Sequence, residues 1–215
     1  MNISLVVFDF DGTLVSSHET IYKTTLHALD EVGIKAEMPE ERFYQMIGWH
    51  FEDIFREFGF AVHDFETFIN IYKSHYFSHL DSSFIYSGVE EILLWLNKRK
   101  IKTALLTTKG QDQAELLLQH FGLIKHFDYV MGRRPGIAHK PSPEPLLKIC
   151  ADVKVKPETA IIVGDTEMDV ECGREAKSKT CAVTYGYRTK EFLQKQLPDF
   201  LIDKIEDLEY IVSGM

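Results

Sequence analysis

The chain has 215 residues, enough for one domain with a large insertion or for two small domains, which excludes both a minidomain and a large multidomain machine. Hydrophobic residues make up 45% of the composition and aromatic residues 12%, so a sizeable core can form without disulfide support. The 24 basic and 33 acidic residues give a net charge of −9, and the chain has no lysine or arginine run, which argues against nucleic acid or an anionic membrane as a partner.

The three cysteines, Cys150, Cys172 and Cys181, form no CxxC pair, and we interpret them as reduced, buried thiols. The first residues show neither the basic region nor the cleavage site of a secretory leader. No apolar segment reaches the roughly 18 residues that a membrane-spanning helix needs. We therefore expect a cytoplasmic protein, and we expect it to be a monomer or a weak homodimer.

Short apolar runs bounded by turn-forming residues recur along the chain and are typical of buried strands. They are Ile3–Phe8, Thr103–Leu106, Tyr129–Met131, Ala160–Val163, Cys181–Thr184 and Phe200–Ile202. Helical spacing of apolar residues separates the later runs, at Val89–Leu96 and at Ala114–Phe121. Strands that alternate with helices predict an α/β fold, a Rossmann-like, doubly wound and mostly parallel sheet.

The first strand is followed by a long stretch that does not fit this alternation. Roughly 70 residues separate Phe8 from the helix that precedes Thr103, far more than an ordinary crossover needs. Helical periodicity alone occurs there, around residues 21–32, 51–58 and 65–76. We therefore predict that residues 1–15 and 83–215 form the α/β core and that residues 16–82 form an inserted α-helical subdomain.

The first strand ends in the segment Asp9-Phe10-Asp11-Gly12-Thr13. Asp9 and Asp11 point to the same side of an extended chain, at the strand end where open α/β sheets bind ligands. Two neighbouring carboxylates favour a hard cation such as Mg²⁺, and Gly12 would let the backbone approach a ligand. An ordinary strand followed by an Asp-Gly turn has the same pattern, so this segment by itself is compatible with both interpretations.

This segment resembles the first motif of the haloacid dehalogenase superfamily of aspartyl-phosphate hydrolases, and three later segments resemble its other motifs in the same order. The helical insertion after the first motif is similar to the cap of the subfamily that contains phosphoglycolate phosphatases, pyrophosphatase-like enzymes and β-phosphoglucomutases. The resemblance covers essentially the whole chain. It implies a Mg²⁺-dependent phosphatase that acts on a small phosphorylated metabolite, such as a phosphoglycolate-like monoester.

The second and third motifs supply a hydroxyl and a lysine. The strand ending at Thr107 matches the second motif, and its hydroxyl would hold phosphoryl oxygens, while Thr108 stands where the family often has Asn. Lys140 matches the third motif, and the resemblance implies that it contacts both the nucleophilic carboxylate and the phosphoryl group. Ser142 and Pro143 predict the N-cap and first residue of a helix.

The fourth motif is a strand ending in Gly164-Asp165, with Asp169 four residues later. If Thr166 opens a helix, Asp169 lies in its first turn and faces back toward the strand end. The resemblance implies that Asp165 is a Mg²⁺ ligand. It also implies that Asp169 either supports the water shell of the metal or orients Lys140.

The resemblance implies a two-step phosphoryl transfer. Asp9 would attack phosphorus and form an aspartyl-phosphate, and Asp11 would protonate the leaving group and then deprotonate the hydrolytic water. The candidate metal ligands are Asp9, the Phe10 carbonyl, Asp11, Asp165 and Asp169.

Further residues are predicted to bind substrate, namely Gly12, Thr108, Gly48, Trp49, His50, Arg133 and Arg134. Arg133 or Arg134 would meet a substrate carboxylate or a second phosphate, with solvated arginines as the alternative. The segment at residues 48–50 stands between two helical patterns of the insertion and would close over the nucleophile.

Three other functions stay open beside the phosphatase. A phosphomutase is disfavoured because Ile21 stands where β-phosphoglucomutases carry histidine, and a pyrophosphatase of the same superfamily remains. A non-catalytic protein that binds a phosphorylated ligand is disfavoured because it would not need Asp11 as an acid and base beside a nucleophile. Ser16 departs from the aspartate that many hydrolase members carry near the cap hinge.

Overall fold

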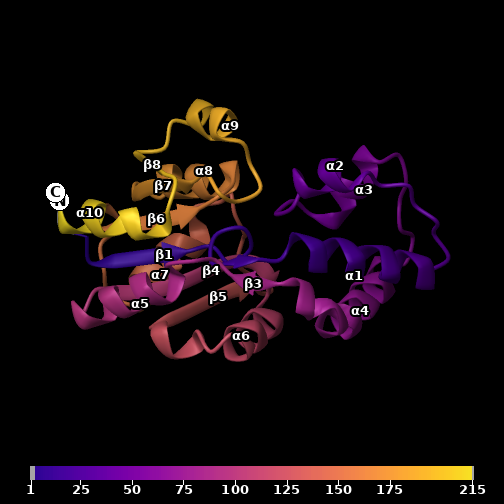
Figure 1. Cartoon of the computed structure of the whole chain (residues 1–215), viewed down its shortest axis with the longest axis horizontal. Helices are drawn as coiled ribbons and strands as arrows, with labels where there is room; N and C mark the ends of the chain where they lie inside the picture. Colours follow the sequence, from indigo (N-terminus) through magenta and orange to yellow (C-terminus); the bar gives the residue numbers. More distant parts are fainter. Residues whose placement is uncertain (1–2, 215) are drawn as a thin grey trace. The chain divides into compact units, whose positions relative to one another are not determined.

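The computed structural model describes residues 3–214, and its main feature is a parallel six-stranded sheet with the order β5-β4-β1-β6-β7-β8 (Figure 1). Every neighbouring pair in this sheet is parallel. The strands are β1 (Leu5–Phe8), β4 (Lys102–Gly110), β5 (Tyr129–Arg133), β6 (Ala160–Gly164), β7 (Lys179–Val183) and β8 (Phe200–Ile202). The predicted Rossmann-like, parallel α/β fold is confirmed, and each predicted strand overlaps an observed one.

Helices cover both faces of this sheet, which explains why its central strands are apolar throughout. Leu5 and Val7 of β1 share a buried cluster with Ile149 of α7 and Cys172 of α8, whereas α5 and α6 contact β4 outside that cluster. The helices are α5 (Val89–Lys98), α6 (Gln111–His120), α7 (Glu144–Asp152), α8 (Glu167–Glu175), α9 (Lys190–Lys195) and α10 (Leu208–Ser213). Single 3-10 turns lie at η2 (Ile124–His126), η3 (Pro157–Thr159) and η4 (Ile205–Asp207).

The carboxyl ends of β1, β4 and β6 lie side by side, because β1 pairs with β4 on one edge and with β6 on the other. Phe8 is in register with both Leu105 and Val163, so the residues after these three positions emerge at one edge of the sheet. Strand β4 is longer than predicted, and its register against β5 shifts between Leu106 and Gly110. Such irregularities bend a strand and redirect its side chains. In β4 the affected stretch starts after Leu106 and includes Thr107.

The start of α7 corrects the sequence prediction by one residue. Pro143, not Ser142, is the N-cap, and the helix begins at Glu144. The Ser142 N–H donates to the His139 carbonyl in the preceding turn, and the Ser142 hydroxyl accepts a hydrogen bond from the Glu144 N–H at 3.3 Å. Ser142 therefore belongs to the turn that leads into the helix.

The chain divides into two compact units, one formed by Met1–Val15 with Ile85–Met215 and the other by Ser16–Phe84. The short strands β2 (Val15–Ser16) and β3 (Phe84–Ile85) pair with each other at the two positions where the chain passes between the units. The second unit is α-helical, with α1 (His18–Glu31), α2 (Glu40–Tyr44), α3 (Phe51–Glu57), α4 (Phe65–Tyr76) and the 3-10 helix η1 (Phe77–Ser82).

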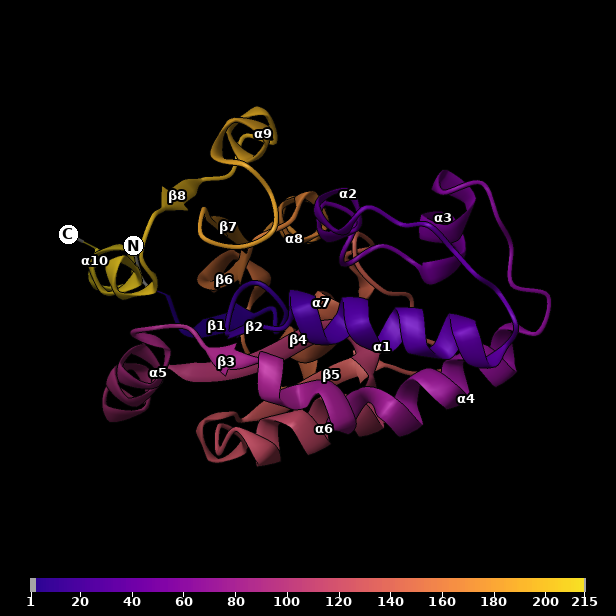
Figure 2. The same cartoon turned by 45° about the vertical axis from the view of Figure 1, so that its right-hand side comes forward.

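Helices α1 and α4 run beside each other in this second unit (Figure 2). Its core is aromatic, and Phe55, Phe68 and Tyr76 are almost fully buried. Phe51 stacks on Phe55 and packs against Phe68 and Tyr72, so it is a core residue of this unit. The short helix α2 has no counterpart in the predicted pattern, because five residues are too few to show a helical period.

All three cysteines are free and buried, as predicted. Burial raises the pKa of the Cys150 thiol to about 11, so this thiol stays protonated and unreactive near neutral pH. Among the helices of residues 3–214, none is long and apolar enough to cross a membrane.

Candidate active site

A buried lysine joins two carboxylates at the carboxyl edge of the sheet. Asp9 directly follows β1, and its N–H donates to the Val163 carbonyl of β6 at 2.9 Å. The Nζ atom of Lys140 lies 2.8 Å from Oδ1 of Asp9 and 2.6 Å from Oδ1 of Asp169. Only 1% of the Lys140 side chain is exposed, so these ionic hydrogen bonds form away from bulk water and hold all three groups in place.

The first turn of α8 holds Asp169 in this position. Thr166 is the N-cap, and Oδ2 of Asp169 accepts hydrogen bonds from the Thr166 N–H at 3.1 Å and from its hydroxyl at 2.6 Å. The first of these bonds and the bond that the Asp169 N–H donates to the Thr166 side chain form a capping box. A Cβ atom on Gly164 would lie 2.0 Å from Cγ of Asp169, so only glycine fits there. The prediction that Thr166 opens a helix with Asp169 in its first turn is confirmed.

Asp165 is fully buried beside Asp9 and Asp169. Its Oδ1 accepts a hydrogen bond from the Thr13 hydroxyl at 3.1 Å, and its Oδ2 accepts one from the Tyr187 N–H at 2.8 Å. Gly12 has a φ of 78°, and a Cβ atom built on it would lie 2.3 Å from Oδ2 of Asp165. Gly12 is therefore required both for its left-handed backbone and for the space that Asp165 fills.

The loop after β7 completes the surroundings of Asp165, and sequence reasoning did not identify it. A Cβ atom on Gly186 would lie 2.3 Å from the Asp165 Cβ, and the Tyr185 hydroxyl donates to the Thr13 carbonyl at 2.9 Å. Arg188 forms two hydrogen bonds with Glu167, at 2.8 Å and 3.2 Å. This loop carries no motif, and only the adjacency of β6 and β7 brings it to the site.

Three carboxylates, of Asp9, Asp165 and Asp169, each offer an oxygen within 4.8 Å of the others. Burial raises the pKa of Asp9 well above its ordinary value against the opposing effect of Lys140, and burial together with Asp169 raises the pKa of Asp165 to about 7. Burial alone would lower the pKa of Lys140, but Asp169 and Asp9 raise it, so Lys140 stays charged. Three carboxylates and one ammonium carry a formal charge of −2 when ionised, which suits one divalent cation with oxygen ligands.

Asp11 pairs with a lysine that sequence reasoning missed. The Nζ atom of Lys109 lies 3.2 Å from Oδ1 of Asp11, and the two side chains are only 7% and 11% exposed. The Lys109 N–H also donates to the Thr107 hydroxyl oxygen at 3.3 Å. A signal for Lys109 existed in the sequence, since it stands two residues after Thr107 and alternation along a strand places i and i+2 on one face.

The carbonyl of Phe10 is a predicted metal ligand, and this role stays a prediction. It accepts hydrogen bonds from the N–H groups of Leu14 and Val15, both at 3.0 Å. These bonds close the turn after β1. Asp11, which is also a predicted metal ligand, lies outside the cluster of three carboxylates.

Three further predicted substrate residues, Thr108, Arg133 and Arg134, lie in or directly after strands β4 and β5. Arg134 donates to the Gln111 side chain at 2.8 Å and to the Val130 carbonyl at 3.0 Å, so it braces the end of β5. Arg133 ends β5 and is exposed, and Thr108 is half-buried in β4. Three residues belong to the helical unit, where their role in binding stays a prediction: Gly48, Trp49 and His50.

The match to a protein family covers most of this chain. The family described as haloacid dehalogenase-like hydrolase matches residues 6–183, a range that includes Asp9, Lys140 and Asp169. The chain belongs to the haloacid dehalogenase-like hydrolase family. The sequence-based identification of the family is confirmed.

Relatives and solved structures agree with this assignment. The chain is 33% identical over 216 residues to pyrophosphatase PpaX of Bacillus cereus and to that of Bacillus anthracis, covering 100% of this chain and 99% of each relative. The crystal structure of a predicted phosphoglycolate phosphatase from Haemophilus somnus has a TM-score of 0.87 at 25% identity and covers 98% of both chains. A haloacid dehalogenase-like hydrolase from Streptococcus pneumoniae, at 24% identity, shares the fold with a TM-score of 0.86. The prediction of an enzyme, a phosphatase of this family, is confirmed.

Proposed function

We propose that this phosphatase hydrolyses a small phosphorylated metabolite with Mg²⁺ and through an aspartyl-phosphate intermediate. The observation that carries the proposal is the Lys140 ammonium between Asp9 and Asp169, with Asp165 beside them, at the carboxyl edge of the sheet. A buried ammonium and a group of carboxylates suited to a cation can together neutralise a phosphate dianion next to a carboxylate nucleophile.

Asp9 is the nucleophile in this proposal. Lys140 binds its Oδ1, which leaves Oδ2 to attack phosphorus in line with the leaving oxygen. A bond forms between Oδ2 and phosphorus as the bond from phosphorus to the leaving oxygen breaks. Water then attacks the phosphorus of the aspartyl-phosphate, which releases phosphate and restores Asp9.

Asp11 serves as the acid in the first step and the base in the second. It gives a proton to the leaving oxygen, and the resulting carboxylate takes a proton from the attacking water. Lys109 holds the Asp11 carboxylate through Oδ1 and aligns the Thr107 hydroxyl through its own N–H. Thr107 would then donate its hydroxyl proton to a phosphoryl oxygen.

Asp169 acts through Lys140. Its Oδ1 accepts a hydrogen bond from the Lys140 ammonium at 2.6 Å, and its Oδ2 accepts two hydrogen bonds from Thr166, which fix the carboxylate next to Lys140. Of the two roles that the family resemblance leaves open, this geometry supports the orientation of Lys140.

Asp9 and Asp165 are the proposed Mg²⁺ ligands, since their carboxylates lie within one cluster and offer hard oxygen donors. When bound, the ion supplies positive charge to the phosphoryl oxygens. Thr13 and the Tyr187 N–H hold the Asp165 carboxylate in the position it needs for this role.

Removal of one proposed ligand tests this assignment. We expect Asp165→Ala to raise the Mg²⁺ concentration for half-maximal activity at least about tenfold, because the cluster loses a charge and a donor. The measurement is a Mg²⁺ titration of initial rates, with Asp152→Ala at the surface as the matched control. Excess chelator should stop the unaltered enzyme, and activity that survives it would refute the Mg²⁺ requirement.

Lys109 offers a second test of the site. We expect Lys109→Met to lower kcat about 10²-fold with a smaller change in KM, because Asp11 loses the group that positions it for proton transfer. Lys109→Arg keeps the positive charge and should restore part of kcat. Unchanged steady-state kinetics in Lys109→Met would show that this ion pair does not serve the reaction.

The substrate is either a phosphoglycolate-like monoester or inorganic pyrophosphate. The relatives that match the whole chain are named pyrophosphatases, which favours pyrophosphate as the second candidate. Comparison of kcat/KM for phosphoglycolate, pyrophosphate and a generic aryl phosphate with Mg²⁺ decides between them. Failure to release phosphate from a broad panel of phosphorylated metabolites would overturn the proposed hydrolysis in favour of a binding protein.

Substrate choice is proposed to depend on residues 48–50 of the helical unit. Trp49 is 40% exposed although it is a large aromatic residue, and His50 is the N-cap of α3. Gly48 has a φ of 103°, so the segment turns sharply there.

The predictions of a cytoplasmic location and of a monomer or weak homodimer are kept as part of this proposal.

A further inference from the structure

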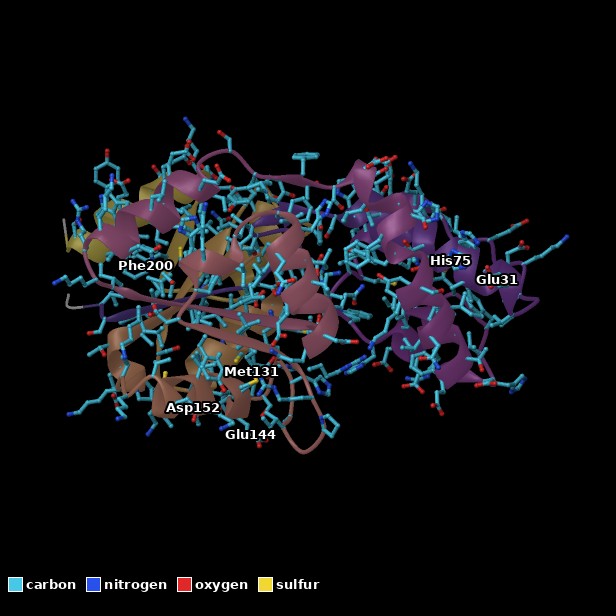
Figure 3. The ribbon with its side chains drawn as sticks, turned by 90° about the horizontal axis from the view of Figure 1, so that it is seen from below. Glu31, His75, Met131, Glu144, Asp152 and Phe200 are labelled. Atoms are coloured by element: carbon cyan, nitrogen blue, oxygen red, sulfur yellow. The ribbon has the colours of Figure 1, made fainter. Side chains whose placement is uncertain are left out.

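A group of histidines with one glutamate gathers on the helical unit, outside the residues that the proposed reaction uses. His27 and Glu31 are one turn apart on α1 and therefore share a face of the helix. His75 lies in the last turn of α4, and α4 packs against α1. Figure 3 shows the labelled side chains of Glu31 and His75 close together.

The ring nitrogens of both histidines converge on one carboxylate oxygen. Oε1 of Glu31 lies 3.2 Å from Nε2 of His27 and 2.8 Å from Nε2 of His75. One ligand atom from each of the three residues lies within 4.8 Å of the others. Bonds of about 2.0–2.1 Å to a tetrahedral Zn²⁺ place ligand atoms roughly 3.3 Å apart, close to these distances. The rings of His27 and His75 stack with centroids 4.0 Å apart, so a rotation of one ring would direct both Nε2 lone pairs at one ion.

A fourth residue holds the ring of His27 from behind. Nδ1 of His27 lies 3.3 Å from Nε2 of His79, on the 3-10 helix η1. When His27 donates its Nδ1 proton to His79, the lone pair of its Nε2 is directed at the position shared with Glu31 and His75. Histidines that bind metals commonly donate their other ring nitrogen in this way, which fixes the tautomer and the ring orientation.

We propose that His27, Glu31 and His75 form a binding site for a divalent transition metal such as Zn²⁺, with His79 positioning His27. Two imidazoles and one carboxylate favour a borderline ion over Mg²⁺, which prefers oxygen ligands alone. The three side chains are 39%, 42% and 30% exposed, so the ion can enter from solvent and keep water in its remaining coordination position. The bound ion would join α1 to α4 and stabilise the folded helical unit.

Metal titrations of the full chain in excess Mg²⁺ test the proposal, because the Mg²⁺ occupies the carboxylate cluster of the core. We expect calorimetry to show one Zn²⁺ bound per chain with micromolar or tighter affinity. We expect Co²⁺ bound at a site with nitrogen ligands to absorb visible light more strongly than Co²⁺ in water. His75→Asn should raise the Kd at least about 100-fold, and His79→Gln about tenfold. His63→Asn, at an exposed histidine of the same unit, is the matched control and should leave the Kd unchanged.

Thermal unfolding gives a second measurement that does not depend on activity. Zn²⁺ should raise the Tm of the unaltered protein and of His63→Asn but leave that of His75→Asn unchanged. If circular dichroism shows that His75→Asn is unfolded, Glu31→Gln replaces it in both measurements with the same expected outcome. Equal Zn²⁺ affinity with and without His75 or Glu31, or loss of Zn²⁺ binding in Asp165→Ala, would overturn the proposal.

Discussion

We expect the substitution Asp9→Asn to abolish turnover and to leave the fold intact. The amide is nearly the same size as the carboxylate and can keep a hydrogen bond from Lys140, but it cannot attack phosphorus. We expect kcat to fall at least about 10⁴-fold, which corresponds to about 5.5 kcal/mol of transition-state stabilisation. The measurement is phosphate release at saturating Mg²⁺, with circular dichroism and thermal unfolding as tests of the fold.

The control for Asp9→Asn is Asp152→Asn. Asp152 is a surface carboxylate of the same compact unit, where it pairs with Lys148. This variant should keep its activity within a factor of about two, because exposed ion pairs contribute little to stability. Residual activity of Asp9→Asn within tenfold of the unaltered enzyme would remove Asp9 from the role of nucleophile.

Lys140→Met should impair both the reaction and the stability. Without the ammonium, Asp9 and Asp169 are buried carboxylates that lose their common partner. Breaking a buried ion pair by removing one partner costs about 3–5 kcal/mol, and we expect the free energy of unfolding in Mg²⁺-free buffer to fall by that amount. We expect kcat to fall about 10³-fold, because Lys140 no longer neutralises the phosphoryl group.

Urea unfolding followed by circular dichroism measures the stability, and initial rates at saturating Mg²⁺ measure the turnover. Lys148→Met is the matched control, since Lys148 also pairs with an aspartate but is 42% exposed. It should lower the free energy of unfolding by less than about 1 kcal/mol. A Lys140→Met variant as stable and active as this control would contradict the proposed position of Lys140 at the centre of the site.

The sequence by itself determined the α/β fold and the residues at the ends of its strands. Runs such as Leu5–Phe8 and Ala160–Gly164 are apolar throughout because both faces of a parallel strand are buried, and this makes them recognisable without a structure. The start of α8 was also local information, because a capping box joins residues only three positions apart, Thr166 and Asp169. The family motifs carry the same information for Asp9 and Lys140.

The family resemblance implied that Lys140 contacts Asp9 and offered its contact with Asp169 as one of two alternatives, but tertiary structure alone decided the partners of Asp165 and Asp11. Lys140 and Asp169 are 29 residues apart, and Thr13 and Asp165 are 152 apart, yet each pair forms a buried hydrogen bond. Such contacts depend on strand order and on the packing of helices against the sheet, which local residue preferences do not encode. The same holds for Lys109, which pairs with Asp11 because β1 and β4 are neighbours in the sheet. A buried ammonium needs a carboxylate partner, and strand order determines which carboxylate lies within reach.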